Sequence, residues 1–223
     1  MNKISVFDID GTLFPYGNDL FFKTMRNLLS AEKDLEQFFK GGKTVKAAER
    51  ILAFCKGRLS EEYGSEFEVL LQQQGESICR ALIDEGEYYP QGFWEIKAAV
   101  SMGHDVYIST ANVEPIVKGV ISALREKQLL PIEVKVLCST WRDGKLFANI
   151  ANNKIVSLEE AAGSAVFDLD VRFYCDDVNG NDKGLADICA WTYVIDGKHN
   201  RKDTLPGHAV RLVWEKLSQK GKN

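Results

Sequence analysis

The chain has few of the residues that build disulfide frameworks or metal sites from sulfur and nitrogen. It contains five cysteines and three histidines in 223 residues, and neither CxxC nor HxxxH spacing occurs, which leaves no zinc pattern. An odd number of scattered cysteines predicts reduced, mostly buried thiols and a cytoplasmic protein. These cysteines are Cys55, Cys79, Cys138, Cys175 and Cys189.

Clustered positive charge and long apolar runs are also missing. The formal net charge is −4 and the pI is about 5.5, which argues against a nucleic-acid surface. No apolar run approaches the roughly 18 residues that a membrane span needs, and no signal-peptide pattern precedes the first motif. With 45% hydrophobic residues the chain can bury a sizeable core. We therefore expect a soluble protein with no nucleic-acid or membrane partner.

The pattern of apolar residues predicts an α/β protein, a Rossmann-like doubly wound parallel sheet with a small helical cap domain inserted after the first strand. A short apolar run at 4–7 resembles a buried strand, residues 19–85 show helical spacing, and strands then alternate with helices. The expected core domain is 1–16 with 87–223, and the expected cap is 17–86. The later elements are expected as helices at 93–102, 113–127, 156–162 and 207–219, strands at 105–110, 132–138, 171–175 and 191–196, and a hairpin turning at Asp143-Gly144.

Polar residues follow three of the expected strands. Because ligands of such sheets gather at the carboxyl ends of the strands, these residues should meet in space. Lys154, at the start of the helix before the 171–175 strand, should join them. The converging residues are Asp8, Asp10, Ser109, Thr110, Asp176, Asp177 and Asp182.

So many carboxylates in one place require a cation. At about 4 Å each like-charged pair costs about 4 kcal/mol at an effective dielectric of 20. Hard oxygen ligands beside a phosphate favour Mg²⁺ over zinc. Lys154 would neutralise part of the remaining charge, and the Thr110 hydroxyl would bind a phosphoryl oxygen. Asp10 could protonate a leaving alkoxide and later deprotonate water.

These motifs resemble the signature of the haloacid dehalogenase superfamily of phosphatases. "FDIDGTL" is similar to its DxDGT motif, "VYISTAN" to the second motif, "NNKIVSL" to the third and "FYCDDVNGND" to the acidic fourth. The resemblance implies that Asp8 is a nucleophile that forms an aspartyl-phosphate and that Asp10 is the general acid/base. It implies Mg²⁺ held by the Asp8 side chain, the Asp10 carbonyl and an acidic residue of the fourth motif. The position of the insert is similar to the cap of the phosphoserine-phosphatase-like branch.

The resemblance also suggests which residues hold a small phosphorylated substrate and which activity to expect. Substrate contacts are expected from Gly11, Thr12, Ser109, Thr110 and Lys154. Because Asp10 is present, phosphoryl transfer is favoured over dehalogenation. The expected activity is a Mg²⁺-dependent phosphatase acting on a small phosphorylated metabolite. The alternatives are a phosphotransferase or mutase of the same family, and a non-catalytic regulatory protein that keeps the fold.

Two positions stay open at the level of sequence. The fourth motif has Asp176 where Gly is usual, so Asp177 is favoured on the metal with Asp176 or Asp182 in support. Strand register decides whether Ser109 or Thr110 faces the phosphate.

Other charged residues are expected away from the site. The three histidines, His104, His199 and His208, are expected at the surface or in loops, and Asp168 and Asp170 in a solvated loop. The basic residues of the insert, Lys23, Arg26, Lys43, Lys46 and Arg50, are expected to form a solvated face.

Overall fold

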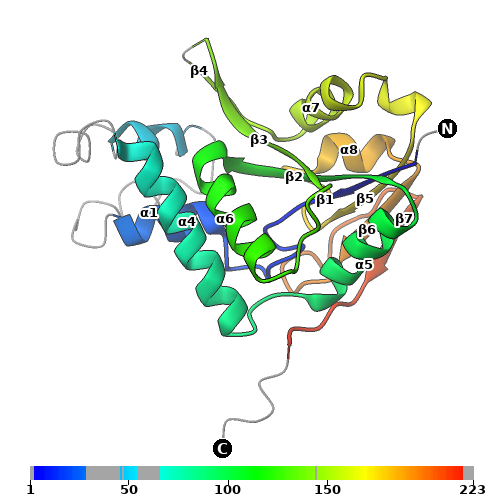
Figure 1. Cartoon of the computed structure of the whole chain (residues 1–223). Helices are drawn as coiled ribbons and strands as arrows, with labels where there is room; N and C mark the ends of the chain where they lie inside the picture. Colours follow the sequence, from blue (N-terminus) through cyan, green and yellow to red (C-terminus); the bar gives the residue numbers. More distant parts are fainter. Residues whose placement is uncertain (1–2, 29–45, 47, 55–65, 144, 218–223) are drawn as a thin grey trace, which may run out of the picture.

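A seven-stranded sheet forms the centre of the protein, in the order β4-β3-β2-β1-β5-β6-β7. A computed structural model describes residues 3–28, 46, 48–54, 66–143 and 145–217. All neighbouring strands run parallel except β3 and β4, which form an antiparallel hairpin. The strands are β1 (Lys3–Phe7), β2 (Asp105–Val113), β3 (Lys135–Arg142), β4 (Lys145–Phe147), β5 (Asp170–Cys175), β6 (Trp191–Ile195) and β7 (Ala209–Leu212). The expected doubly wound α/β fold is confirmed (Figure 1).

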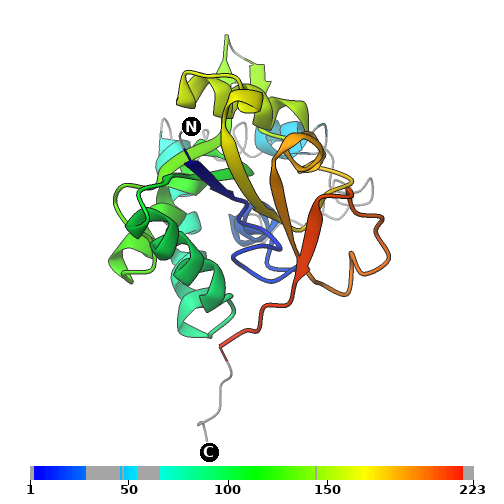
Figure 2. The ribbon, with the colours of Figure 1, turned by 90° about the vertical axis from the view of Figure 1, so that its right-hand side faces the viewer.

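Helices cover both faces of the sheet because the strands are apolar on both sides. In β1, Phe7 joins one buried cluster together with α5 (Pro90–Ser101) and α6 (Glu114–Glu126). Ile4 and Val6 join a second cluster with α7 (Asn152–Ala162) and α8 (Lys183–Ile188). Figure 2 shows the green α5 and α6 and the yellow to orange α7 and α8 on opposite sides of the strands. This double burial is typical of parallel sheets.

The described part of the segment between β1 and β2 is helical. It includes α1 (Leu20–Leu28), helical residues at 48–54, and α4 (Phe67–Asp84). The helix α4 lies against α6 so closely that a Cβ at Gly119 would come within 2.0 Å of the Gln72 carbonyl oxygen. The apolar side chains of α1 and α4 belong to the same buried cluster as α5 and α6. The described helices α1 and α4 are therefore packed against the core.

Most expected elements are present, with shifted ends. The hairpin near Asp143 is confirmed by pairing of Thr140 with Phe147, and α7 begins at Asn152, four residues before its expected start. Of the cap's basic residues, Arg26, Lys46 and Arg50 are exposed and Lys23 is half-buried, while Lys43 lies outside the described residues.

The helix expected at 207–219 is wrong. Ala209–Leu212 forms the strand β7, which pairs in parallel with β6. The apolar run at 209–213 is too short to fix its own helical period, and the open edge of β6 offers backbone hydrogen bonds to it.

Two expectations from composition can be compared with the structure. The four described cysteines, Cys79, Cys138, Cys175 and Cys189, form no disulfide, and Cys55 lies outside the described residues. Among the described residues, no helix combines the length and apolar character needed to cross a bilayer.

Candidate active site

A buried ion pair joins the ends of two elements that are far apart in the sequence. Asp8 directly follows β1, and its N–H donates to the Tyr174 carbonyl of β5 at 2.9 Å. Lys154, in the first turn of α7, is fully buried, and its Nζ donates to Asp8 Oδ1 at 2.8 Å. The same ammonium donates to the Ser109 carbonyl of β2 at 3.0 Å. One lysine thus ties together the strand ends that the sequence predicted to converge.

Two further carboxylates complete the cluster around Lys154. Asp182 Oδ1 accepts from Lys154 Nζ at 2.5 Å, and its Oδ2 accepts from the Asp177 N–H at 3.3 Å. Carboxylate oxygens of Asp8, Asp176 and Asp182 all lie within 4.8 Å of one another. All three side chains are buried.

The electrostatics of this cluster favour an additional cation. Burial raises the pKa of the Asp8 carboxyl well above its usual range, and the Lys154 ammonium only partly opposes this. Burial would lower the pKa of Lys154, but Asp182 and Asp8 outweigh it and raise that pKa. One ammonium therefore faces three carboxylates, and hard oxygen donors at this spacing fit Mg²⁺.

The carboxylate oxygens of the cluster differ in how many hydrogen bonds they accept. Asp182 is bonded at both oxygens, whereas Asp8 and Asp176 each keep one oxygen that makes no hydrogen bond within the described chain. The donor set therefore fits a metal held by Asp8 and Asp176, with Asp182 oriented behind them by Lys154.

Asp10 has a different environment from Asp8. Its Oδ1 accepts from the Leu20 N–H at 3.1 Å, at the start of α1, and its Oδ2 accepts from Asn112 Nδ2 at 2.7 Å. Burial and the nearby charge of Asp19 raise the pKa of Asp10 to about 8, although both hydrogen bonds favour the ionised form. A carboxyl with such a pKa can hold a proton near neutral pH and release it during a reaction.

The two residues after Asp10 differ in what they can do. Gly11 has φ +79°, and a Cβ at this position would lie 2.0 Å from Asp176 Oδ2, so only glycine allows the loop to approach that carboxylate. Thr12 is fully buried, its hydroxyl makes no hydrogen bond within the described chain, and it does not line the cavity described below.

The structure distinguishes Ser109 from Thr110. Ser109 Oγ accepts from Asn149 Nδ2 at 3.1 Å, and Ser109 does not line the cavity. Thr110 does line it, and its Oγ1 accepts from the backbone N–H and the Nδ2 of Asn112 at 3.2 and 3.0 Å. Thr110 is therefore the hydroxyl placed to meet a substrate.

Asp176 belongs to the three-carboxylate cluster, whereas Asp177, which the sequence favoured as a metal ligand, does not. Asp177 is half-buried and lines the cavity, but its Oδ2 accepts from the Asn181 N–H at 2.9 Å, and it is not part of the three-carboxylate cluster. The Asp176 carboxylate lies within the cluster and is bonded on its outer side by His199 Nε2 at 2.9 Å. Burial raises the pKa of Asp176 to about 6, and the His199 hydrogen bond works against this shift.

Sequence reasoning missed several residues of the site. His199 lies in a loop as expected, but its ring bonds Asp176 and stacks on Tyr16 with ring centroids 4.0 Å apart. His104 lies outside the site, in the loop before β2 as expected, but it is buried there and bonded to Ser5 Oγ. Asn112 contacts both Asp10 and Thr110, and its only sequence signal was its place as the last, polar residue of the second motif.

A cavity of about 580 Å³ opens above these residues. Its polar side carries Asp8, Asp10, Thr110, Asn112, Asp176, Asp177 and Asp182, and its other walls include Tyr16, Phe21, Phe22, Val113, Leu146 and Ile150. Leu146 belongs to β4, so the hairpin and the helix α1 both contribute to the opening.

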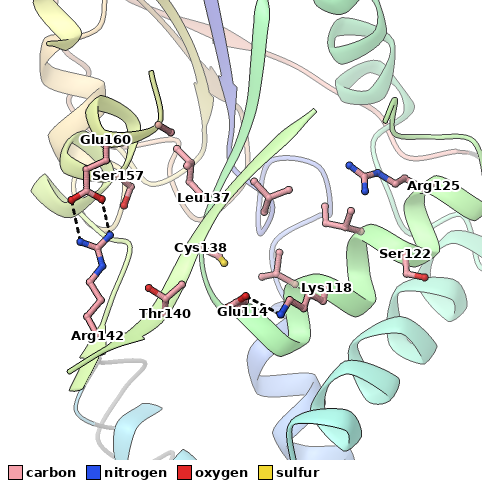
Figure 3. Close-up of a pocket in the computed structure, with 14 residues that line it drawn as sticks. Glu114, Lys118, Ser122, Arg125, Leu137, Cys138, Thr140, Arg142, Ser157 and Glu160 are labelled. Carbon is pink, nitrogen blue, oxygen red and sulfur yellow. Dashed lines mark hydrogen bonds and ion pairs between the residues drawn. The ribbon is translucent and has the colours of Figure 1, made fainter. Parts of the chain in front are cut away.

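A second, larger hollow of about 860 Å³ lies between α6, β3 and α7 (Figure 3). It holds none of the residues that the sequence predicted for the site. Four of its five charged side chains form ion pairs with each other, Glu114 with Lys118 at 2.9 Å and Glu160 with Arg142 at 2.8 Å. The fifth, Arg125, donates to the backbone carbonyls of Ile132 and Val134. Size alone therefore does not mark the reactive cavity in this protein.

Comparison with known proteins identifies solved structures that have a similar fold. No family model matches the chain, and no curated protein matches it significantly. Among solved structures, a phosphoserine phosphohydrolase-like protein from Francisella tularensis is similar at 14% identity and TM-score 0.54, covering 94% of this chain and 95% of the other. A β-phosphoglucomutase from Clostridium difficile is similar at 17% identity and TM-score 0.53, covering 94% and 91%.

A haloacid dehalogenase family hydrolase from Salmonella enterica is also similar, at 13% identity and TM-score 0.51, covering 96% of this chain and 68% of the other. At these identities the similarity concerns the fold. The resemblance suggested by the motifs is thus confirmed at that level: the chain has the fold of haloacid dehalogenase superfamily hydrolases and phosphomutases.

Proposed function

We propose that the protein is a Mg²⁺-dependent phosphatase of the haloacid dehalogenase superfamily that hydrolyses a small phosphorylated metabolite through an aspartyl-phosphate on Asp8. The observation that carries the proposal is the buried cluster in which Lys154 bonds Asp8 at 2.8 Å beside the carboxylates of Asp176 and Asp182. Structural ion pairs rarely leave three carboxylates to share one ammonium, because the unbalanced charge is costly when buried.

Asp8 is the proposed nucleophile because it directly follows β1 and has one oxygen without a hydrogen bond among the described residues. Lys154 holds the other oxygen and so orients the carboxylate toward a phosphorus atom in the cavity. When bound, Mg²⁺ would be held by Asp8 and Asp176 and would supply charge neutralisation between the attacking carboxylate and the phosphoryl oxygens. The Thr110 hydroxyl is placed to donate to one of those oxygens.

Asp10 is the proposed general acid and base. A pKa near 8 lets it protonate the leaving alkoxide, and the carboxylate left behind can then accept a proton from the water that hydrolyses the aspartyl-phosphate. Asn112 and the Leu20 N–H hold this carboxylate in place. The Leu20 hydrogen bond also ties the proposed acid to the insert, which would shield the intermediate from bulk water.

The test is hydrolysis of p-nitrophenyl phosphate in Mg²⁺. The wild type should release nitrophenol, EDTA should stop the reaction, and Asp8→Asn should lower kcat by at least about 10³-fold with the fold intact. Asp168→Asn is the matched control, since it also removes one carboxylate but lies in an exposed turn away from the cavity. Normal activity in Asp8→Asn would refute the nucleophile assignment.

Phosphotransfer to a second hydroxyl is the alternative within the same chemistry. If water is the acceptor, inorganic phosphate appears at the same rate as nitrophenol. A deficit of phosphate that grows with an added sugar acceptor would instead identify a phosphotransferase. No reaction with a broad panel of phosphate esters in Mg²⁺ would favour a non-catalytic protein that keeps the fold.

A further inference from the structure

The walls of the reactive cavity carry far more negative than positive charge. Seven carboxylate side chains line it, while the described lining residues include no lysine or arginine and one histidine, His199. A divalent cation and Lys154 together offset three of these charges. Asp8, Asp176 and Asp182 take part in that balance, and four of the carboxylates lie outside the cluster: Asp10, Asp177, Asp19 and Asp203. Of these four, Asp10 is the proposed acid and base, and Asp177 accepts from the Asn181 N–H.

Asp19 and Asp203 lie on parts of the chain that could meet a leaving group rather than the phosphate. Asp19 Oδ1 accepts from the Phe22 N–H at 3.1 Å and so begins α1 of the insert. Its charge contributes to the raised pKa of Asp10, the proposed proton donor to the leaving group. Asp203 is half-buried on the loop after β6, and its carboxylate makes no hydrogen bond or ion pair with any other described residue.

Aromatic side chains also line the cavity. Tyr16, Phe21 and Phe22 come from the loop before α1 and from α1 itself, and all three line the opening. The faces of aromatic rings attract ammonium groups, and nearby carboxylates add to that attraction. Asn112 supplies a further acceptor, because its Oδ1 is buried and makes no hydrogen bond within the described chain.

We propose that the site selects phosphomonoesters whose leaving group carries an ammonium, and discriminates against leaving groups that carry a carboxylate. This inference rests on the proposed phosphatase activity and concerns the substrate class of the same site. A carboxylate in the leaving group would face Asp19 and Asp203 as like charges, whereas an ammonium would face them as opposite charges next to aromatic rings.

The experiment compares three short alkyl phosphates of similar length in Mg²⁺: 2-aminoethyl phosphate, propyl phosphate and the phosphate ester of 3-hydroxypropanoate. We expect kcat/KM to fall in that order, with about a 100-fold difference between the first and the last. Equal rates, or faster hydrolysis of the carboxylate ester, would overturn the substrate assignment alone. No hydrolysis of any ester, nor of p-nitrophenyl phosphate, would instead overturn the proposed phosphatase.

Two variants show whether the named carboxylates cause the selection. Asp203→Asn and Asp19→Asn should each narrow the ratio between ammonium and carboxylate esters by about tenfold. Asparagine also caps helices, so Asp19→Asn keeps the start of α1, and circular dichroism reports that each variant is folded. Asp168→Asn removes an exposed carboxylate elsewhere and should leave the ratio unchanged. An unchanged ratio in the Asp19→Asn, Asp203→Asn double variant would contradict the proposal.

Discussion

The two hollows of this protein differ in how their charges are balanced. In the larger one, between α6, β3 and α7, each labelled acid in Figure 3 has a basic partner at ion-pair distance: Glu114 with Lys118 and Glu160 with Arg142. In the smaller one, Lys154 alone faces the buried carboxylates of Asp8 and Asp182.

The location of the charges also differs. The pairs of the larger hollow are solvent-exposed, with side chains between 44% and 61% accessible, so water screens them and they cost little to form or lose. Lys154 is 1% accessible and Asp182 is 2% accessible, so their charges are scarcely screened. Uncompensated buried charge is kept in proteins mostly where chemistry uses it, and this supports our assignment of the proposed activity to the smaller hollow.

The largest effect is expected from removing the one buried cation. Lys154→Met leaves Asp8 and Asp182 without their ammonium, so we expect metal-free protein to lose about 3–5 kcal/mol of unfolding free energy. Activity should fall at least about 10²-fold because Asp8 is no longer oriented. Urea unfolding in EDTA and p-nitrophenyl phosphate turnover measure the two effects. Adding Asp8→Asn to this variant should recover part of the stability; a further loss would contradict the charge argument.

The next effect concerns the contact between Gly11 and Asp176. In Gly11→Ala the new Cβ would come 2.0 Å from Asp176 Oδ2, so the Asp176 carboxylate must move away from residue 11 and leave its present place in the cluster. We expect the Mg²⁺ concentration for half-maximal activity to rise at least about tenfold. Gly163→Ala is the control: φ there is +68°, close to the +79° of Gly11, but nothing lies within 4 Å of the added Cβ. If both variants shift the Mg²⁺ requirement equally, backbone strain rather than contact is the cause.

The order of the motifs made most of this site predictable from sequence. Asp8 and Asp10 follow β1 and Thr110 lies in the carboxyl half of β2, and parallel strands bring their carboxyl ends together whatever their separation along the chain. Lys154 was predicted for the same reason, as the start of the helix before β5. These placements depend on the spacing of apolar residues and on the alternation of strands and helices, and both can be read from short stretches of sequence.

The features of the site and fold that the sequence did not reveal depend on the directions of side chains and on the paths of long loops. Asp176 and Asp177 both lie after the end of β5 at Cys175, so the bend that follows the strand decides which of them enters the cluster, and sequence alone does not fix that bend. His199 reaches Asp176 from a loop 23 residues away. The strand β7 replaced an expected helix because pairing with β6 overrode a weak local preference.

A third prediction uses the pH dependence of the metal-free protein. The pKa values of Asp10 and Asp176 are raised to about 8 and about 6, so the folded state binds protons more tightly than the unfolded state. The unfolding free energy should therefore be highest near pH 4 and fall as pH rises toward 8. Urea unfolding in EDTA at several pH values measures this slope.

Asp10→Asn should flatten that slope, because it removes the group with the higher pKa value of the two. A matched change at an exposed acid, Asp168→Asn, should leave it as it is. An unfolding free energy that rises between pH 5 and 8 in EDTA would show that burial does not raise the pKa values of the carboxyl groups in the smaller hollow. Saturating Mg²⁺ should reduce the fall, since the metal binds the ionised carboxylates.

The smallest effect is expected in the larger hollow. Arg142→Gln removes an exposed ion pair with Glu160 and a contact over the Phe147 ring at 3.7 Å. We expect the melting temperature to fall by less than about 2 °C and kcat/KM for p-nitrophenyl phosphate to stay within about twofold. Phe147 is next to Leu146, which lines the reactive cavity, so a larger loss of activity would show that the β3–β4 hairpin couples the two hollows. Glu160→Gln separates the two contributions, because it removes the ion pair and keeps the arginine over the ring.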